Sequence, residues 1–261
     1  MTSAARAVGT LGRAVDEGLV RIGEVATLIG RASAHLARGR RRLRHIVYQV
    51  LQVGVRSLPL ALVMSGFAGM VLAFQFGYGL QRFGARLYIG QVTVTAIFRE
   101  LGPILAALVV GGRIGAGIAA ELGGMAVTEQ VDAVRALGAD PIERLVAPRL
   151  IAATIALPLL TIVADLVAVT GAVVIASFQY SVSPRLFLNG VYEFVTMGDF
   201  ASGLFKSIFF GLLVGAISCQ EGLRARGGTE GVGRATTRAV VAIAVSALAA
   251  DFVLTKVLLS L

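Results

Sequence analysis

Long apolar blocks separated by short polar segments make up this chain from residue 46 onward. A helix needs about 20 mostly apolar residues to cross a bilayer, and blocks of roughly that length recur along the sequence. The pattern predicts five membrane-spanning helices, at about 46–80, 92–120, 150–178, 201–219 and 239–259. The predicted fold class is therefore an all-α integral membrane protein, with residues 46–261 as one transmembrane domain.

The segment before the first block has a different pattern. Between residues 6 and 36 the larger apolar residues recur every three or four positions, with arginines between them, at Val8, Leu11, Val15, Leu19, Ile22, Ala26 and Ile29. This spacing places the apolar side chains on one stripe of a helix. We predict that residues 1–45 form a basic, amphipathic segment that lies in the membrane interface. A soluble helix packed on a partner is the alternative.

Composition and charge support the membrane assignment. The chain is 56% hydrophobic and only 15% charged, with a net charge of +9. The arginines lie between apolar blocks rather than along one face, which argues against a nucleic-acid partner. Nine arginines precede Ile46, and seven more follow the second and fourth blocks. By the positive-inside rule, the N-terminus is predicted to be cytoplasmic and the C-terminus to lie outside.

The sequence offers little catalytic chemistry. Neither of the two lysines follows a glycine in a phosphate-binding loop, so the chain is not expected to hydrolyse ATP. His35 and His45 are the only histidines, and neither lies at metal-ligand spacing from other ligands. Cys219 is the only cysteine, which excludes an intrachain disulfide. We predict neither an enzyme nor a metal or cofactor site.

Residues 128–149 form the most structured polar loop, TEQVDAVRALGADPIERLVAPR. We expect Thr128 to cap a short helix that ends at Gly138 and whose apolar face is Val131, Val134 and Leu137. Asp140, Pro141 and Glu143 indicate the N-cap, N1 and N3 positions of a second helix, which Pro148 would stop. Such a loop suits docking to another protein, and a solvated hairpin is equally compatible with the pattern.

Six ionisable residues fall inside the apolar blocks, where each needs a partner, a cavity or water. They are Arg99, Glu100, Arg113, Asp165, Lys206 and Asp251. Arg99 and Glu100 point about 100° apart on a helix and so need partners elsewhere. Lys206 could meet Glu100 across the bundle or bind an anionic headgroup. Asp165 is a candidate for a proton relay or for a hydrogen bond to a neighbouring helix.

Small residues spaced four apart occur at Gly111 and Gly115 and at Gly211 and Gly215. This spacing permits close approach of helices. Packing within one chain and dimerisation are equally compatible with it.

Three strings resemble the MlaE/YrbE permeases of Mce-type lipid ABC transporters. They are FRELGPILAALVVGGRIGAGIAAELGGMAVTEQVDAVRALGADPIERLVAPR from Phe98, GVGRATTRAVV from Gly231 and DFVLT from Asp251. The resemblance implies a homodimer of five-span permeases in the bacterial inner membrane. It also implies a cytoplasmic ABC ATPase pair that binds ATP and magnesium, often a small STAS-domain protein, and a periplasmic MCE-domain hexamer. The cargo would be phospholipid or a related lipid, in the context of outer-membrane lipid asymmetry.

The resemblance also implies roles for particular residues. Arg99, Glu100 and Lys206 match positions at the central lipid cavity or its polar rim. The cavity wall would include Met70, Leu72, Phe74, Gln75 and Phe76. The segment that couples the permease to the ATPase would be residues 128–149, with Thr128, Glu129, Val131, Asp132, Val134, Leu137, Gly138, Asp140 and Pro141.

Two other functions compete with this one. An ion- or proton-coupled secondary transporter would use Asp165 and Asp251, although such folds usually contain two related halves and no repeat is visible here. A non-transporting membrane scaffold is the other alternative. Copurification of an ATPase would separate both from a permease.

Overall fold

The computed structural model describes residue 20, residues 23–32, residue 34 and residues 43–260. Within those ranges it is a bundle of helices, and five of them are long and apolar enough to cross a membrane. They are Ile46–Arg82, Arg86–Val127, Ile142–Tyr180, Met197–Leu223 and Gly228–Ser260. The predicted all-α membrane fold with five spans is confirmed, and every span is longer than its apolar block.

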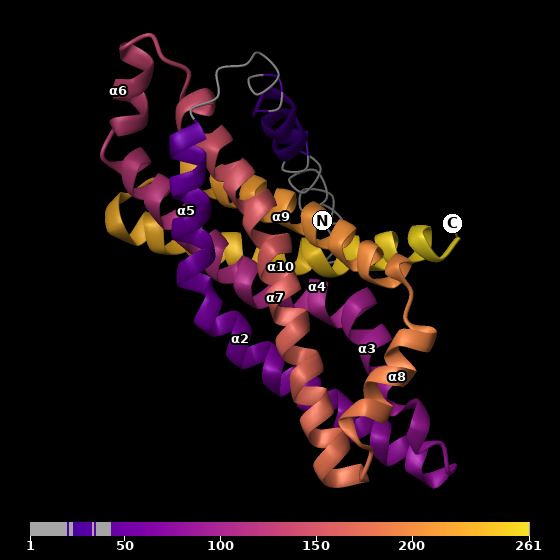
Figure 1. Cartoon of the computed structure of the whole chain (residues 1–261). Coiled ribbons are helices and arrows are strands. Elements are labelled where there is room, and N and C mark those ends of the chain that lie inside the picture. Colours follow the sequence, from indigo (N-terminus) through magenta and orange to yellow (C-terminus); the bar gives the residue numbers. More distant parts are fainter. Residues whose placement is uncertain (1–19, 21–22, 33, 35–42, 261) are drawn as a thin grey trace, which may run out of the picture.

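The first span belongs to α2 (Leu43–Arg82), which continues through Pro59. The third is α7 (Ala147–Tyr180), the fourth α9 (Met197–Leu223) and the fifth α10 (Gly228–Ser260). In Figure 1, α2 and α7 run beside each other along the length of the bundle. Next to them α7 packs on α9, and α9 packs on α10. The main apolar core lies where α5, α7, α9 and α10 meet.

The second span is built from short consecutive pieces. These are η1 (Arg86–Tyr88), α3 (Ile89–Ala96), η2 (Ile97–Leu101), α4 (Gly102–Leu105), η3 (Ala106–Val110) and α5 (Gly111–Val127). The segments η2 and η3 are π-type turns, in which a backbone N–H bonds the carbonyl five residues earlier, as from Gly102 to Ile97. Pro103 follows the first wide turn, separated from it by Gly102. We attribute that turn to the proline, which lacks an N–H and whose ring would crowd a regular α-helix.

Two short helices close opposite ends of the bundle. Helix α6 (Gln130–Ala136) connects the second span to the third, and α8 (Pro184–Phe194) connects the third to the fourth. The hydroxyl of Ser183 accepts the N–H of Leu186 at the start of α8, and Phe187 of α8 is fully buried in a second apolar cluster. These helices define the α6 end and the α8 end of the molecule.

The spaced glycines pack within the chain. A Cβ on Gly211 would lie 2.7 Å from the carbonyl oxygen of Ala153, and one on Gly215 would lie 3.1 Å from Leu150, both on α7. A Cβ on Gly111 would lie 2.8 Å from Val214 of α9. The sequence left two alternatives open, packing within one chain and dimerisation. In the structure these glycines allow helices of one chain to pack closely.

Most of the predicted N-terminal helix lies outside the described residues. Residues 23–32 are helical, and their Ala32 is fully buried against α7 and α9. Glu24 accepts a hydrogen bond from Gln220 at 2.6 Å and forms an ion pair with Arg224. The described part therefore packs on the α6 end of the bundle. Its position at a membrane interface stays a prediction.

Candidate functional site

A cluster of polar groups inside the bundle surrounds the ammonium group of Lys206, whose side chain is 2% exposed. Its Nζ donates to Glu100 Oε2 at 2.6 Å, to the Thr255 hydroxyl at 2.7 Å and to the Arg99 carbonyl oxygen at 3.0 Å. Asp251 Oδ1 lies 3.2 Å away. Thr255 also donates to Glu100, at 3.1 Å. We call Glu100, Lys206, Asp251 and Thr255 the Lys206 cluster.

Three spans contribute to this cluster. Glu100 comes from η2, Lys206 from α9, and Asp251 and Thr255 from α10, where their spacing of four places them on one face. A buried charge is tolerated only when it is paired and hydrogen-bonded, and here each neighbouring helix supplies a group. The structure realises the contact between Lys206 and Glu100 that was one of the two alternatives from the sequence.

Arg99 faces a different partner, as its position beside Glu100 requires. Its guanidinium lies 3.4 Å from Asp199 Oδ1, and the two side chains are 33% and 13% exposed. Asp199 also closes a capping box with Thr196 at the start of α9. Because Arg99 and Glu100 keep partial exposure while Lys206 does not, they form the accessible edge of the polar region.

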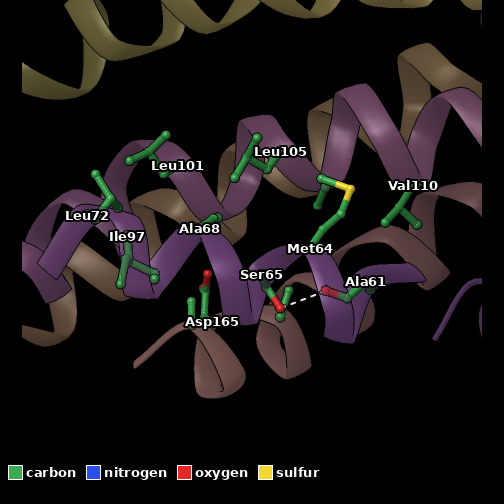
Figure 2. A pocket seen from close by; sticks show the side chains of 15 residues that line it. Ala61, Met64, Ser65, Ala68, Leu72, Ile97, Leu101, Leu105, Val110 and Asp165 are labelled. Carbon is green, nitrogen blue, oxygen red and sulfur yellow. Dashed lines mark hydrogen bonds between the residues drawn. The ribbon is translucent and has the colours of Figure 1, made fainter. Parts of the chain in front are cut away.

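An apolar pocket, partly open to its surroundings, lies beside the same π-turn. It is lined by α2, by the η2–α4–η3 part of the second span and by α7. Figure 2 shows Asp165 rising from α7 on one side, with Leu101 and Leu105 on the opposite side. Asp165 is 4% exposed, and its Oδ1 has no hydrogen-bond partner among the described residues. The sequence marked Asp165 but gave no sign of the pocket.

The expected wall residues on α2 point in several directions. Leu72 lines the pocket, whereas Phe74 is 48% exposed on the outside of the bundle. Gln75 is exposed, and Met70 and Phe76 are half-buried. The backbone carbonyl of Phe74 accepts a hydrogen bond from the Tyr180 hydroxyl at 2.6 Å. The five residues therefore do not form one surface within this protomer.

The predicted coupling segment contains a helix, but its cap differs from the expectation. Helix α6 starts at Gln130, and Glu129 occupies the N-cap with a left-handed backbone, φ 60°. The Thr128 hydroxyl instead donates to the Gly124 carbonyl at 2.8 Å. Thr128 is not the cap because its hydroxyl is used by the last turn of α5. Gly138, with φ 74°, follows the end of α6 as predicted.

The second predicted helix starts at the expected place and does not stop where expected. Asp140 Oδ1 accepts the N–H of Ile142 at 2.9 Å, the cap contact predicted for it, and Pro141 follows it. Pro148 does not end the helix. The π-type turn η4 (Ile142–Val146) precedes it, and the chain then continues directly into α7. As at Pro103, we attribute the wide turn to the proline.

The apolar face of α6 is only partly used. Val131 is 5% exposed and holds α6 against the bundle, and Val134 is half-buried. Leu137 is 83% exposed at the far end of the helix. Asp132 pairs with Arg135 at 2.8 Å on the outer side. Leu137 is thus a large, exposed apolar side chain next to a helix whose exposed residues include Asp132 and Arg135.

Below this segment, two ion pairs connect the spans, and each has one buried and one half-exposed partner. Arg149 on α7 forms a two-pronged contact with Glu121 of α5, at 2.6 and 3.4 Å, and its side chain is 7% exposed. Glu221 of α9, 4% exposed, accepts from Arg238 of α10 at 3.0 Å. Two-pronged pairs fix orientation as well as distance. The base of the α6 end is therefore held in a defined arrangement.

These observations define a class: a polytopic α-helical membrane protein with a buried polar cluster, a pocket and an exposed apolar side chain on its loop between spans. Sequence comparison identifies the family. The sequence model of the family "Permease MlaE" matches residues 46–257. The chain belongs to the MlaE permease family.

Individual relatives agree with this assignment. A probable ABC transporter permease protein of Synechocystis sp. is 41% identical over 227 residues, which cover 87% of this chain and 86% of the relative. One from Rickettsia typhi is 41% identical over 213 residues, covering 82% of each. Protein TRIGALACTOSYLDIACYLGLYCEROL 1, chloroplastic, of Arabidopsis thaliana is 37% identical over 232 residues, covering 89% of this chain and 66% of the relative. The chain is thus an ABC transporter permease, which replaces the secondary-transporter and scaffold alternatives.

The signals in the sequence differed in strength. Glu100 and Lys206 were singled out because charges in apolar blocks are rare. Asp199 and Thr255 were missed as partners, since a threonine in a span and an aspartate at a helix start are ordinary. The sequence signal that could have identified Thr255 was its spacing of four residues from Asp251. The lipid-binding and coupling roles of the individual residues stay predictions.

Proposed function

We propose that this permease moves phospholipid or a related lipid between the bacterial inner membrane and a periplasmic MCE-domain protein, driven by a cytoplasmic ABC ATPase pair. Membership of the MlaE permease family is the observation that carries the proposal. The name of the Arabidopsis relative refers to a lipid, trigalactosyldiacylglycerol, which agrees with such a cargo. The ATPase supplies the ATP and magnesium sites that this chain is not expected to have.

The polar region suits the headgroup of such a lipid. Lys206 is enclosed and committed to protein partners, so direct contact with a phosphate falls to Arg99, which is one-third exposed. The guanidinium matches phosphate geometry through its paired N–H donors. Lys206 then acts as a positioning residue that holds Glu100 and the π-turn in place. Lys206, which was first expected to line the cavity or its rim, would thus act on the lipid indirectly.

A homodimer fits the apolar surface of the protomer. Large side chains on the outer faces of α2 and α10 are exposed, among them Phe67, Phe74, Leu248 and Phe252. Lipid tails or a second copy would cover such a surface in the membrane. In the dimer, the exposed wall residues Phe74 and Gln75 would face a cavity between the two copies. That placement accounts for side chains that form no common surface in one protomer.

The α6 end suits the ATPase. Leu137 projects from a short helix, and an exposed apolar residue next to charged residues is a typical anchor for a partner cleft. We place this end and the N-terminus in the cytoplasm, the α8 end and the C-terminus in the periplasm. A STAS-domain protein beside the ATPase, an MCE hexamer over the α8 end and a contribution to outer-membrane lipid asymmetry complete the proposal.

The ATPase part is tested by purifying the tagged permease from its host's membranes in mild detergent and identifying the chains that come with it. The wild type should retain an ABC ATPase, and Leu137→Asp should lose it because a charge replaces the anchor. Tyr192→Ser is the matched control, since Tyr192 is also 83% exposed but lies on α8. A wild-type permease without any ATPase would contradict the proposal.

The lipid part is tested by reconstituting the purified complex in vesicles with a fluorescent phospholipid. ATP should drive movement of the phospholipid, and Arg99→Gln should reduce both movement and the amount of lipid retained on the complex. Arg185→Gln, a change of an exposed arginine on α8, should have no effect. Absence of ATP-dependent lipid movement by the wild type would overturn this function.

A further inference from the structure

The pocket that Asp165 lines is mostly apolar, and the headgroup contact proposed for Arg99 does not explain why an aspartate lies in it. Its lining is apolar apart from Asp165 and Ser65. The Ser65 hydroxyl donates to the Ala61 carbonyl of its own helix at 2.6 Å. Asp165 is therefore the one polar lining side chain with an oxygen that has no hydrogen-bond partner among the described residues. A buried carboxyl group without a hydrogen bond is costly, so its retention in this pocket calls for a ligand or a bound water.

The local packing keeps the carboxyl group in place. A Cβ on residue 102 would lie 1.8 Å from Asp165 Oδ1, so only glycine at Gly102 leaves room for the side chain. Gly102 follows the π-turn that also carries Arg99 and Glu100. One short segment thus borders both the polar region and the pocket. A lipid with its headgroup at Arg99 would have its chain beside Asp165.

A proton relay explains the pocket less well. Proton transfer between side chains needs a second titratable group within reach, and no other lining residue is ionisable. Asp165 also has no ion-pair partner among the described residues. A hydrogen-bond donor supplied by the occupant satisfies the carboxyl group without a relay.

The placement of the headgroup indicates which part of a lipid could supply that donor. With the headgroup at Arg99, the part of the lipid that enters the pocket is an acyl chain, and the apolar lining suits such a chain. The donor must therefore sit on the apolar part of the molecule, and a hydroxyl group is the uncharged donor that an acyl chain most simply carries.

We propose that Asp165 and its pocket select lipids whose apolar part carries a hydroxyl group. The apolar lining holds the chain, and Asp165 accepts the hydrogen bond from the hydroxyl. The proposal rests on the lipid-transport function above and names its substrate class. It assigns Asp165 a role in specificity and leaves headgroup binding to the polar region.

The test presents the complete permease–ATPase complex with two lipids that differ only in the hydroxyl group. Complexes are reconstituted in vesicles of equimolar oleoyl and ricinoleoyl phosphatidylethanolamine, repurified, and the retained lipids measured by mass spectrometry. The wild type should prefer the ricinoleoyl lipid by about tenfold, the value of roughly one hydrogen bond. Asp165→Val should abolish the preference while lipid binding persists. Thr161→Val, one turn earlier on α7 and outside the pocket lining, should keep it.

A second variant separates selection from folding. Ala68→Leu fills the pocket from α2 and keeps Asp165, so it should lower the preference without removing the carboxyl group. Equal retention of the two lipids by the wild type would overturn the proposal and indicate a bound water as the partner of Asp165. In that case ATP-driven lipid movement would continue and the proposed function would stand. Wild-type complexes that retain neither lipid would overturn both.

Discussion

Lys206 and Asp165 are both ionisable side chains enclosed by apolar helices, but their surroundings differ. Lys206 has two carboxylates, a hydroxyl and a backbone carbonyl within 3.2 Å, drawn from three spans. Asp165 faces a pocket, and its Oδ1 has no partner among the described residues. A charge whose partners are fixed by the fold stabilises one arrangement of helices, whereas an unsatisfied group leaves free energy for a ligand to recover.

Among the substitutions that test this comparison, replacing Lys206 should have the largest effect on stability. Lys206→Met leaves the Glu100 and Asp251 carboxylates without their shared cation, which should lower the free energy of unfolding by about 3–5 kcal/mol. Thermal unfolding in detergent, followed by circular dichroism, measures the change. Lys256→Met, at the other lysine of the chain, is the control because Lys256 is exposed. Equal stability of the two variants would show that the cluster does not hold the spans together.

A substitution at Gly102 tests the packing around Asp165. Gly102→Ala brings a methyl group against Asp165 Oδ1 and should destabilise the fold by about 1–3 kcal/mol. Combining it with Asp165→Ala should recover most of that loss, so the two changes would be non-additive. Gly117→Ala, where a Cβ meets nothing within 4 Å, should be nearly neutral. Additive losses would mean that the clash lies elsewhere, for instance at Ile97.

Removing the carboxyl group of Asp165 should change the free energy of unfolding in the opposite direction from replacing Lys206. Asp165→Val replaces an unsatisfied buried group by an apolar one of similar size, and the free energy of unfolding should rise by about 1–2 kcal/mol in lipid-free detergent. The same unfolding measurement applies, with Thr161→Val as the reference. A clear loss of stability would reveal a partner for Asp165 and make its environment resemble that of Lys206.

The smallest effect is expected at the edge of the Lys206 cluster. Thr255→Val keeps the shape of the side chain and removes a hydroxyl that contacts Lys206 and Glu100, at a cost of about 0.5–1 kcal/mol. Thr237→Val is the control, because the Thr237 hydroxyl bonds only its own helix on the exposed side of α10. If Thr255→Val were as damaging as Lys206→Met, the hydroxyl rather than the ion pairs would organise the cluster.

The sequence predicted the parts of the fold that depend on local patterns. Apolar length gave the five spans, since a helix must be long enough to cross the bilayer. The turn chemistry at Gly138 and Asp140 was also readable, because those residues act on their own backbone. The predicted cap at Thr128 and the predicted helix end at Pro148 were wrong because the surrounding structure decided the roles of these residues. The hydroxyl of Thr128 was used by the preceding helix, and a π-turn carried the chain past the proline.

The sequence by itself determined that this chain is a five-span membrane protein of a recognisable permease family, with rare charges at Glu100, Lys206 and Asp165. Only the tertiary structure decided which of these charges are satisfied. Partners such as Thr255 lie more than a hundred residues from Glu100 and meet it only when three helices pack. A pocket is likewise the space left between helices, and the pattern of apolar residues along one helix does not encode it.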